Sequence, residues 1–339
     1  MNLDDITPDW VGTVLGREVG AITFEQVGTG QIGTCFRVRI DGGDTVLVKL
    51  PPPDTSARDL MAGAYRGEVR FYQRLASTVD VRTPECFHAE IADDSGDFVI
   101  ALEDLAPREQ GDQIAGCTGD QARDAVVNLA GLHGPRWCDP TLAEIDTLTI
   151  NGPDEIALLL DMWEPTCELF LSGLGDLIAD EDAATLRACG DVIERWLLAR
   201  SERFGPVHGD YRLDNLLFPP DGGPGVVAVD WQTLSLALPA RDLAYFVGTS
   251  LSVEDRRRHE RELVAAYHEA LTSYGVTGYS LEDCWDDYVF AMIQGPLVSI
   301  FGCAYGTRTE RGDQMFAVMI ARTCTAIRDL DTLALVAAQ

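Results

Sequence analysis

Basic side chains are scarce in this sequence, and lysine is almost absent. The 339 residues include 55 Asp plus Glu but only 26 Lys plus Arg, which gives a formal charge of −29. Lys49 is the single lysine, and every other basic residue apart from histidine is arginine. A chain this acidic repels nucleic-acid backbones and anionic membrane surfaces. We therefore expect neither a nucleic-acid nor a membrane partner.

Several other signals are also missing. The nine cysteines contain no Cys-x-x-Cys pair, which disfavours a zinc knuckle or a disulfide framework. The acidic first residues lack the basic start and apolar core of a signal peptide. The longest apolar stretch, 288–305, is interrupted by Gln294, Gly295 and Pro296, which predicts a buried, kinked helix rather than a membrane span. We expect a cytoplasmic protein.

The pattern of apolar residues predicts an α+β fold with two lobes. Short alternating or apolar segments separated by Gly/Asp turns predict an antiparallel sheet with one helix, with strands at 21–27, 34–40, 45–50, 86–91 and 98–102. Longer periodic segments then predict helices near 119–134, 153–172, 181–203, 254–274, 281–303 and 311–330. We expect an N-terminal lobe at 1–102, a hinge at 103–107 and a helical C-terminal lobe at 108–339.

A glycine motif follows the first predicted strand, at Gly28, Gly30 and Gly33. A dinucleotide-binding fingerprint would have to open a helix, yet the residues after Gly33 alternate as a strand. The motif therefore belongs to a hairpin, whose backbone N–H groups could cover a triphosphate. An ordinary glycine-rich turn has the same pattern.

Lys49 and Glu68 form a second candidate constellation. Lys49 ends an apolar strand, and a sequence that otherwise uses arginine retains lysine where a compact ammonium is needed. Glu68 falls on the apolar stripe of the following helix, where a carboxylate needs a partner. We expect an ion pair that directs the Lys49 ammonium toward phosphates. A surface lysine and a solvated glutamate are the alternatives.

The most specific segment is His208-Gly-Asp-Tyr-Arg-Leu-Asp-Asn215. Apolar segments at 216–218 and 226–229 predict a hairpin whose open end carries Asn215 and Asp230, an amide and a carboxylate that could share Mg²⁺. Asp210 could accept the proton of an attacking hydroxyl, whereas His208 fits a packed loop residue. A structural Ca²⁺ site or unrelated turn residues remain open.

These residues resemble the aminoglycoside phosphotransferase and choline kinase-like superfamily, whose members are relatives of protein kinases that phosphorylate small molecules. The likeness rests on His-Gly-Asp-x-x-x-x-Asn, the apolar hairpin and Asp230-Trp231, and by element order it spans about residues 20–330. The string 208–215 is similar to the branch that includes the kinase-like domains associated with acyl-CoA dehydrogenases.

The resemblance implies a bilobal protein-kinase-like fold, with ATP and Mg²⁺ as cofactors. It makes Asp210 the catalytic base and Asp242 a buried brace of the catalytic loop. It also implies that the backbone of the hinge, at Glu103 and Leu105, binds adenine. It implies that Lys49, held by Glu68, binds the nucleotide phosphates and that the loop of Gly28, Gly30 and Gly33 covers them. It also implies that Asn215 and Asp230 bind magnesium.

The acceptor is left open by the sequence. Only ten residues separate Asp230 from Arg241, too few for a peptide-docking activation segment, so we expect a small-molecule hydroxyl acceptor and no protein substrate. An antibiotic-type alcohol and a metabolic hydroxy acid or hydroxyacyl-CoA both fit. The aromatic stretch 285–305 could line an apolar pocket or could be plain core, and Arg308 and Arg311 are weak candidates for binding an anionic acceptor. A nucleotide-binding pseudokinase is the alternative outside enzymes.

Overall fold

The computed structural model describes residues 1–28, 33–93 and 95–339, which form two compact units. The small unit comprises residues 1–78, 83–108 and 229–234. The large unit comprises residues 79–82, 109–228 and 235–339. The third segment of the small unit, residues 229–234, follows the hairpin of the large unit and includes Asp230.

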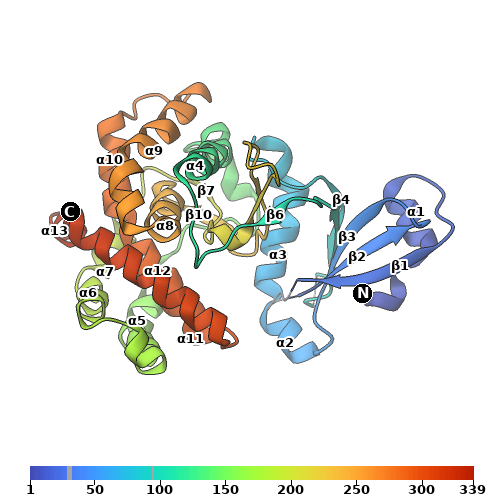
Figure 1. Ribbon diagram of the computed structural model, residues 1–339, viewed down its shortest axis with the longest axis horizontal. Helices are drawn as coiled ribbons and strands as arrows, with labels where there is room; N and C mark the ends of the chain where they lie inside the picture. The colour runs from blue at the N-terminus through green and yellow to red at the C-terminus, as the bar shows by residue number, and fades with distance from the viewer. Residues whose placement is uncertain (29–32, 94) are drawn as a thin grey trace. The chain divides into compact units, whose positions relative to one another are not determined.

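The small unit is built on a five-stranded antiparallel sheet with the strand order β1-β2-β3-β5-β4 (Figure 1). Its strands are β1 (Ile22–Val27), β2 (Thr34–Ile40), β3 (Thr45–Leu50), β4 (Cys86–Ile91) and β5 (Phe98–Glu103). Its helical segments are Leu3–Asp5, α1 (Pro8–Leu15), α2 (Thr55–Leu60), α3 (Ala62–Arg70), Phe71–Leu75 and Ala76–Thr78.

Strand β3 explains how this sheet presents a charged group. Successive side chains of a strand point to opposite faces. Val46, Val48 and Leu50 join the apolar cluster that includes Val11 of α1, while Leu47 packs with the cluster that contains residues of α3. Lys49 has the same parity as Leu47, so the alternation directs the ammonium to the α3 face.

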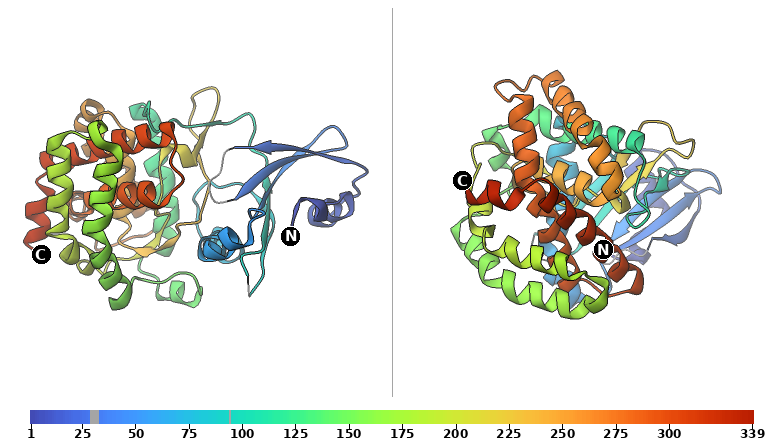
Figure 2. Two further views of the ribbon diagram at one scale, coloured as in Figure 1. Left: turned by 90° about the horizontal axis from the view of Figure 1, so that it is seen from below. Right: turned by 60° about the vertical axis from the view of Figure 1, so that its left-hand side comes forward.

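The large unit is mainly helical (Figure 2). Its α-helices are α4 (Gly119–His133), α5 (Pro153–Leu174), α6 (Asp180–Gly190), α7 (Ile193–Leu198), α8 (Ala240–Ser250), α9 (Val253–Ser273), α10 (Leu281–Phe290), α11 (Gln294–Tyr305), α12 (Glu310–Asp329) and α13 (Thr332–Ala337). Its short helical turns are Gly134–Arg136, Pro140–Glu144, Gly175–Leu177, Leu213–Asn215 and Ala291–Ile293. Its strands are β6 (Glu109–Gln110), β7 (Gly205–Val207), β8 (Leu216–Phe218), β9 (Val227–Ala228) and β10 (Ser235–Ala237).

Two predicted helices are each divided in the structure. The segment 181–203 forms α6 and α7, because Gly190 and Asp191 are poor helix formers. The segment 281–303 forms α10, a 3₁₀ turn and α11. Pro296 lacks the N–H that would continue the ladder, and its ring disfavours the preceding turn.

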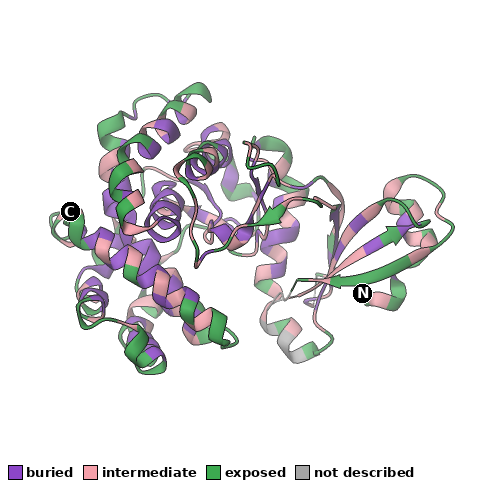
Figure 3. Ribbon diagram, viewed as in Figure 1, coloured by how far each residue is buried: buried purple, intermediate pink, exposed green. Residues whose placement is uncertain are grey.

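Other helices were absent from the prediction. The small unit holds α1, α2 and three short helical segments in addition to α3, so the expectation of one helix there is wrong. Helix α1 nevertheless begins with Thr7 as N-cap and Pro8 at its first position, which is a recognisable start signal. Nearly all residues of helix α8 are buried (Figure 3), so its polar residues do not mark a solvent-exposed face.

One helical stretch in the described part of the chain, Leu281–Tyr305, is long and apolar enough to cross a membrane. However, 67% of its apolar window is buried inside the protein. Tyr288, Phe290 and Met292 are fully buried, and Pro296 divides the stretch as described above. The core helix of a folded domain has the same properties.

Candidate active site

The small unit brings two other predicted site residues, Glu68 and Asp230, to Lys49. The Lys49 Nζ atom lies 2.6 Å from Glu68 Oε2 and 3.4 Å from Asp230 Oδ1. Gln232 Nε2 also donates to Glu68 Oε2, at 3.3 Å. The side chain of Glu68 is 2% exposed, whereas that of Asp230 is 43% exposed. The expected ion pair between β3 and α3 is therefore present, and it leaves Asp230 open to solvent.

Electrostatics keep Lys49 charged in this cluster. Burial lowers the pKa of Lys49, but the negative charges of Asp230 and Glu68 outweigh it, so the pKa is raised above its usual value. Burial raises the pKa of Glu68, and Lys49 counteracts this rise. Asp230 has a φ of +67°, an uncommon conformation for a residue other than glycine, and such strain is concentrated at functional sites.

The residues predicted to cover and hold a nucleotide also lie in the small unit. Gly28 has a φ of +72°, and a Cβ on Gly33 would lie 3.2 Å from the Leu50 carbonyl oxygen; Gly30 falls outside the described residues. Glu103 ends β5, opposite Val46. Within the described residues, the N–H of Leu105 makes no hydrogen bond, so it is available as a donor.

The loop from His208 to Asn215 in the large unit, the expected catalytic loop, is held by Asp242 of α8. The Asp242 carboxylate, which is fully buried, accepts hydrogen bonds from His208 N at 2.6 Å and Gly209 N at 2.9 Å. His133 Nε2 lies 3.3 Å from the same carboxylate, and its Nδ1 lies 2.7 Å from the hydroxyl of Tyr267. His133 thus has a structural place beside Asp242, and Asp242 fixes the backbone that leads to Asp210.

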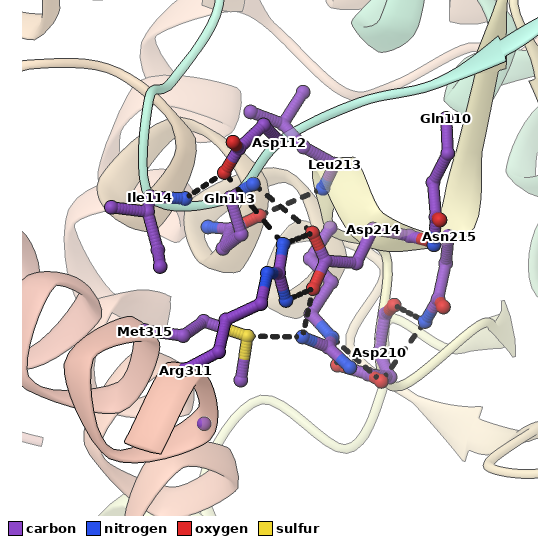
Figure 4. A network of polar contacts seen from close by, with 12 residues as sticks. Gln110, Asp112, Gln113, Ile114, Asp210, Leu213, Asp214, Asn215, Arg311 and Met315 are labelled. Atoms are coloured by element: carbon purple, nitrogen blue, oxygen red, sulfur yellow. Dashed lines mark hydrogen bonds and ion pairs between the residues drawn. The ribbon is translucent and has the colours of Figure 1, made fainter. Parts of the chain in front are cut away.

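Both carboxylate oxygens of Asp210 accept hydrogen bonds from neighbouring side chains. Tyr245 donates its hydroxyl to Asp210 Oδ1 at 2.7 Å. Asn215 Nδ2 donates to Asp210 Oδ2 and to the Asp210 carbonyl, both at 2.9 Å (Figure 4). Arg212 Nε lies 3.0 Å from each carboxylate oxygen. The carboxylate is still 23% exposed, so a substrate hydroxyl could reach it.

The contacts of Asn215 determine which of its atoms could meet a metal. Because Nδ2 donates twice to Asp210, the amide oxygen Oδ1 is the remaining ligand atom, and it has no hydrogen-bond partner in the described chain. No group of three or more His, Cys, Asp or Glu side chains poised to hold a metal occurs among the described residues. An amide oxygen is among the oxygen donors that Mg²⁺ accepts, and this ion is commonly held by few protein ligands.

Gln113, which follows β6, and Arg311 of α12 both hold Asp214 of the same loop (Figure 4). Asp214 accepts hydrogen bonds from Gln113 N at 3.0 Å and from Arg311 at 3.1 and 3.2 Å. Burial raises the pKa of Asp214, but the hydrogen bond from Arg311 and the charge of Arg212 lower it by more. Gln113, which is fully buried, also accepts from Leu213 N at 2.8 Å.

These contacts bear on the weaker sequence candidates. Arg311 is occupied by Asp214, and Arg308 pairs with Asp313 at 2.7 Å and donates to the Gly173 carbonyl. Neither arginine is a free cation for an acceptor. The aromatic stretch 285–305 is mostly core, although Tyr305 is 63% exposed. Sequence reasoning missed Arg212, which lies inside the motif it had already identified, and Tyr245 and Gln113, for which the sequence gives no local signal.

Fold and site together define the class of protein. An antiparallel sheet that carries a Lys–Glu ion pair, combined with a helical unit whose loop displays Asp210 and Asn215, is the architecture of protein-kinase-like phosphotransferases. Residues 23–277 match the sequence profile of the phosphotransferase enzyme family. The chain belongs to this family and is a small-molecule kinase.

Comparison with individual proteins adds to the family assignment. A 54-residue segment is 43% identical to mouse (Mus musculus) acyl-CoA dehydrogenase family member 10, and covers 15% of this chain but only 5% of that protein. A structure from Ralstonia eutropha JMP134, provisionally assigned as an aminoglycoside phosphotransferase, is 18% identical over 94% of this chain and 97% of its own, with a TM-score of 0.57.

Two further structures share the fold at lower identity. The GDP complex of aminoglycoside 2'-phosphotransferase-IIIa is 13% identical, covers 93% of this chain and 96% of its own, and has a TM-score of 0.55. Ethanolamine kinase from Plasmodium vivax is 13% identical over 92% of this chain and 85% of its own, with a TM-score of 0.54. At these identities the likeness concerns the fold alone.

Proposed function

We propose that this protein transfers the γ-phosphate of a magnesium-bound nucleoside triphosphate, ATP in the first instance, to a hydroxyl group of a small molecule. The observation that carries the proposal is the arrangement of Asp210, a partly exposed carboxylate whose position is fixed by Tyr245, Arg212 and Asn215. A fixed and accessible carboxylate on this loop suits a group that takes a proton from an acceptor hydroxyl.

In the proposed reaction, Asp210 accepts a proton during transfer of the γ-phosphate to the acceptor hydroxyl. The acceptor hydroxyl gives its proton to the Asp210 carboxylate as its oxygen forms a bond to the γ-phosphorus. The bond between this phosphorus and the β,γ-bridging oxygen breaks, and the nucleoside diphosphate leaves with that electron pair. Arg212 and Asn215 keep the carboxylate in place while its proton content changes.

The remaining roles follow from the other predicted residues. We assign Lys49, held by Glu68, to the nucleotide phosphates, beneath a loop formed by Gly28, Gly30 and Gly33. Asn215 and Asp230 would hold Mg²⁺, which neutralises charge on the phosphates when it is bound. The hinge backbone at Glu103 and Leu105 would bind the nucleobase. The need for nucleoside triphosphate and the nine free cysteines support action in the cytoplasm.

Two acceptor classes deserve testing first. The first is an antibiotic-type alcohol, because a protein named as an aminoglycoside phosphotransferase has a similar fold. The second is a metabolic hydroxy acid or hydroxyacyl-CoA. It is favoured by the 43% identity to a segment of a protein named for acyl-CoA dehydrogenation. The occupied Arg308 and Arg311 offer no support for an anionic acceptor.

The test is acceptor-stimulated ADP or GDP release with Mg·ATP or Mg·GTP, using aminoglycosides, macrolides, choline, ethanolamine, sugars and hydroxyacyl-CoA compounds. Asp210→Asn serves as the paired variant, and nucleotide binding is measured for both proteins. Stimulated release that falls by several orders of magnitude in Asp210→Asn, with nucleotide binding retained, supports the proposal. Equal release by the two proteins would refute the role of Asp210. Nucleotide binding without release by the wild type would favour the pseudokinase.

A further inference from the structure

Helix α8 contacts the catalytic loop at two points. Asp242 and Tyr245 are three residues apart and therefore lie on the same face of the helix. Asp242 binds the loop backbone through two N–H groups, as described above, whereas Tyr245 binds the side chain of Asp210. One rigid element thus sets both the path of the loop and the orientation of its carboxylate.

We propose that Tyr245 is a positioning residue for phosphoryl transfer, which fixes the rotation of the Asp210 carboxylate by donating its hydroxyl to Oδ1. This inference rests on the proposed function, since it assigns Tyr245 to the group identified there as the base. Tyr245 itself touches neither acceptor nor nucleotide in this role.

The environment of Tyr245 gives it a fixed position and a fixed direction of donation. The residue is 1% exposed, and its ring packs in an apolar cluster with Met315 and Met319 of α12. Burial, and then the negative charge of Asp210, raise the pKa of the phenol well above its usual value. The hydroxyl therefore remains a donor. Arg212 and Asp214 are the other charged groups that act on it.

The two oxygens of Asp210 are held in different ways. Oδ2 accepts from Asn215, and Arg212 lies at 3.0 Å from both oxygens. Tyr245 lies outside the catalytic loop and donates a hydrogen bond to Oδ1 but not to Oδ2. Without it, the carboxylate keeps its anchor at Oδ2 but loses the contact from rigid α8 that limits its rotation. Transfer depends steeply on such alignment, while nucleotide affinity does not depend on Oδ1.

The experiment compares Tyr245→Phe with Tyr288→Phe. Tyr288 is also fully buried and donates to a carboxylate, Glu260, at 3.0 Å, away from the catalytic loop. Each substitution removes one hydroxyl that donates to a carboxylate and leaves the ring, so the two variants are matched in the chemical change. Thermal unfolding of both proteins checks that they fold.

We expect Tyr245→Phe to lower kcat for ADP release from Mg·ATP about tenfold, the effect of one hydrogen bond to a charged group, with an unchanged KM for nucleotide. Tyr288→Phe should retain the wild-type kcat. Equal kcat values for the two variants, or a Tyr245→Phe effect confined to nucleotide KM, would overturn the inference.

A double-mutant cycle separates this inference from the proposed function. If Tyr245 acts through the carboxylate, Tyr245→Phe should not lower the residual kcat any further in an Asp210→Asn background. A full tenfold effect in both backgrounds would overturn the positioning role. Wild-type turnover by Asp210→Asn itself would instead refute the proposed function. An inactive Asp210→Asn beside a fully active Tyr245→Phe would remove only the role of Tyr245.

Discussion

Replacing Asp242 with Asn tests whether the catalytic loop depends on a buried negative charge. The change preserves size but exchanges one acceptor oxygen for an NH₂ donor. In the wild type, one oxygen accepts from His208 N at 2.6 Å and faces His133 Nε2, and the other accepts from Gly209 N at 2.9 Å. Whichever way the new amide is turned, its NH₂ faces one of these backbone donors. One buried N–H therefore loses its partner.

The cost can be worked out from these contacts. An unsatisfied buried donor costs about 1–3 kcal/mol, and the surviving hydrogen bond falls from the charged range of about 1.5–3 to a neutral value of about 1 kcal/mol. The sum is about 2–5 kcal/mol, a large part of the 5–15 kcal/mol that typically stabilises a domain. We expect the loop from His208 to Asp210 to loosen as well, so kcat should fall.

Chemical unfolding of the wild type, Asp242→Asn and Asp161→Asn measures this cost. Asp161 is exposed on α5 of the same unit, and its substitution should change the free energy of unfolding by no more than about 0.5 kcal/mol. A loss for Asp242→Asn that equals the loss for Asp161→Asn would show that the buried charge does not hold the loop. Tryptophan fluorescence follows the unfolding, because Trp196 in the large unit is buried.

Three further predictions concern the small unit. Lys49→Arg should weaken binding of Mg·ATP at least tenfold in calorimetry, because a guanidinium beside Glu68 cannot match the compact ammonium. Asp230→Asn should raise the magnesium concentration needed for half-maximal turnover, and chelation of Mg²⁺ should abolish turnover of the wild type; an unchanged magnesium requirement would contradict the metal role. Arg37→Gln should destabilise the protein by about 3 kcal/mol at pH 7, because Arg37 Nε donates at 2.6 Å to Asp104, whose side chain is 3% exposed. Burial raises the pKa of Asp104, but the hydrogen bond from Arg37 and other contacts lower it below its ordinary 3.8, so this stabilisation is present above about pH 4 and is lost as the pH falls. The difference between variant and wild type should therefore shrink at pH 3, and a constant difference would refute the charge argument.

The parts of the site that could be predicted from sequence are those fixed by local geometry. Strand alternation and helix periodicity predict that Lys49 and Glu68 face one another, and the structure contains this pair at 2.6 Å. The bracing role of Asp242 came from family resemblance, and its carboxylate accepts from His208 and Gly209. In both cases short-range rules, or a motif of fixed spacing, determine the contact.

The parts that could not be predicted depend on packing between distant segments. Nearly all residues of helix α8 are buried, so no solvent-exposed face indicated from the sequence that Tyr245 faces the loop. Gln113 reaches Asp214 from a segment about 100 residues earlier in the chain, and its sequence neighbourhood carries no pattern. Such contacts follow from tertiary structure, which outweighs local propensity.

The scarcity of lysine acquires a physical explanation from these contacts. The arginines near the loop form forked contacts with carboxylates, as Arg311 does with Asp214 through two nitrogens, a geometry that suits guanidinium. Lys49 instead has a single carboxylate oxygen at 2.6 Å and a second at 3.4 Å, with 17% of its side chain exposed. A larger planar group would have to displace Glu68 or Asp230, and overpacking of this kind costs about 1–3 kcal/mol. The one position that retains lysine is therefore the one where a small, point-like cation is required between two acids.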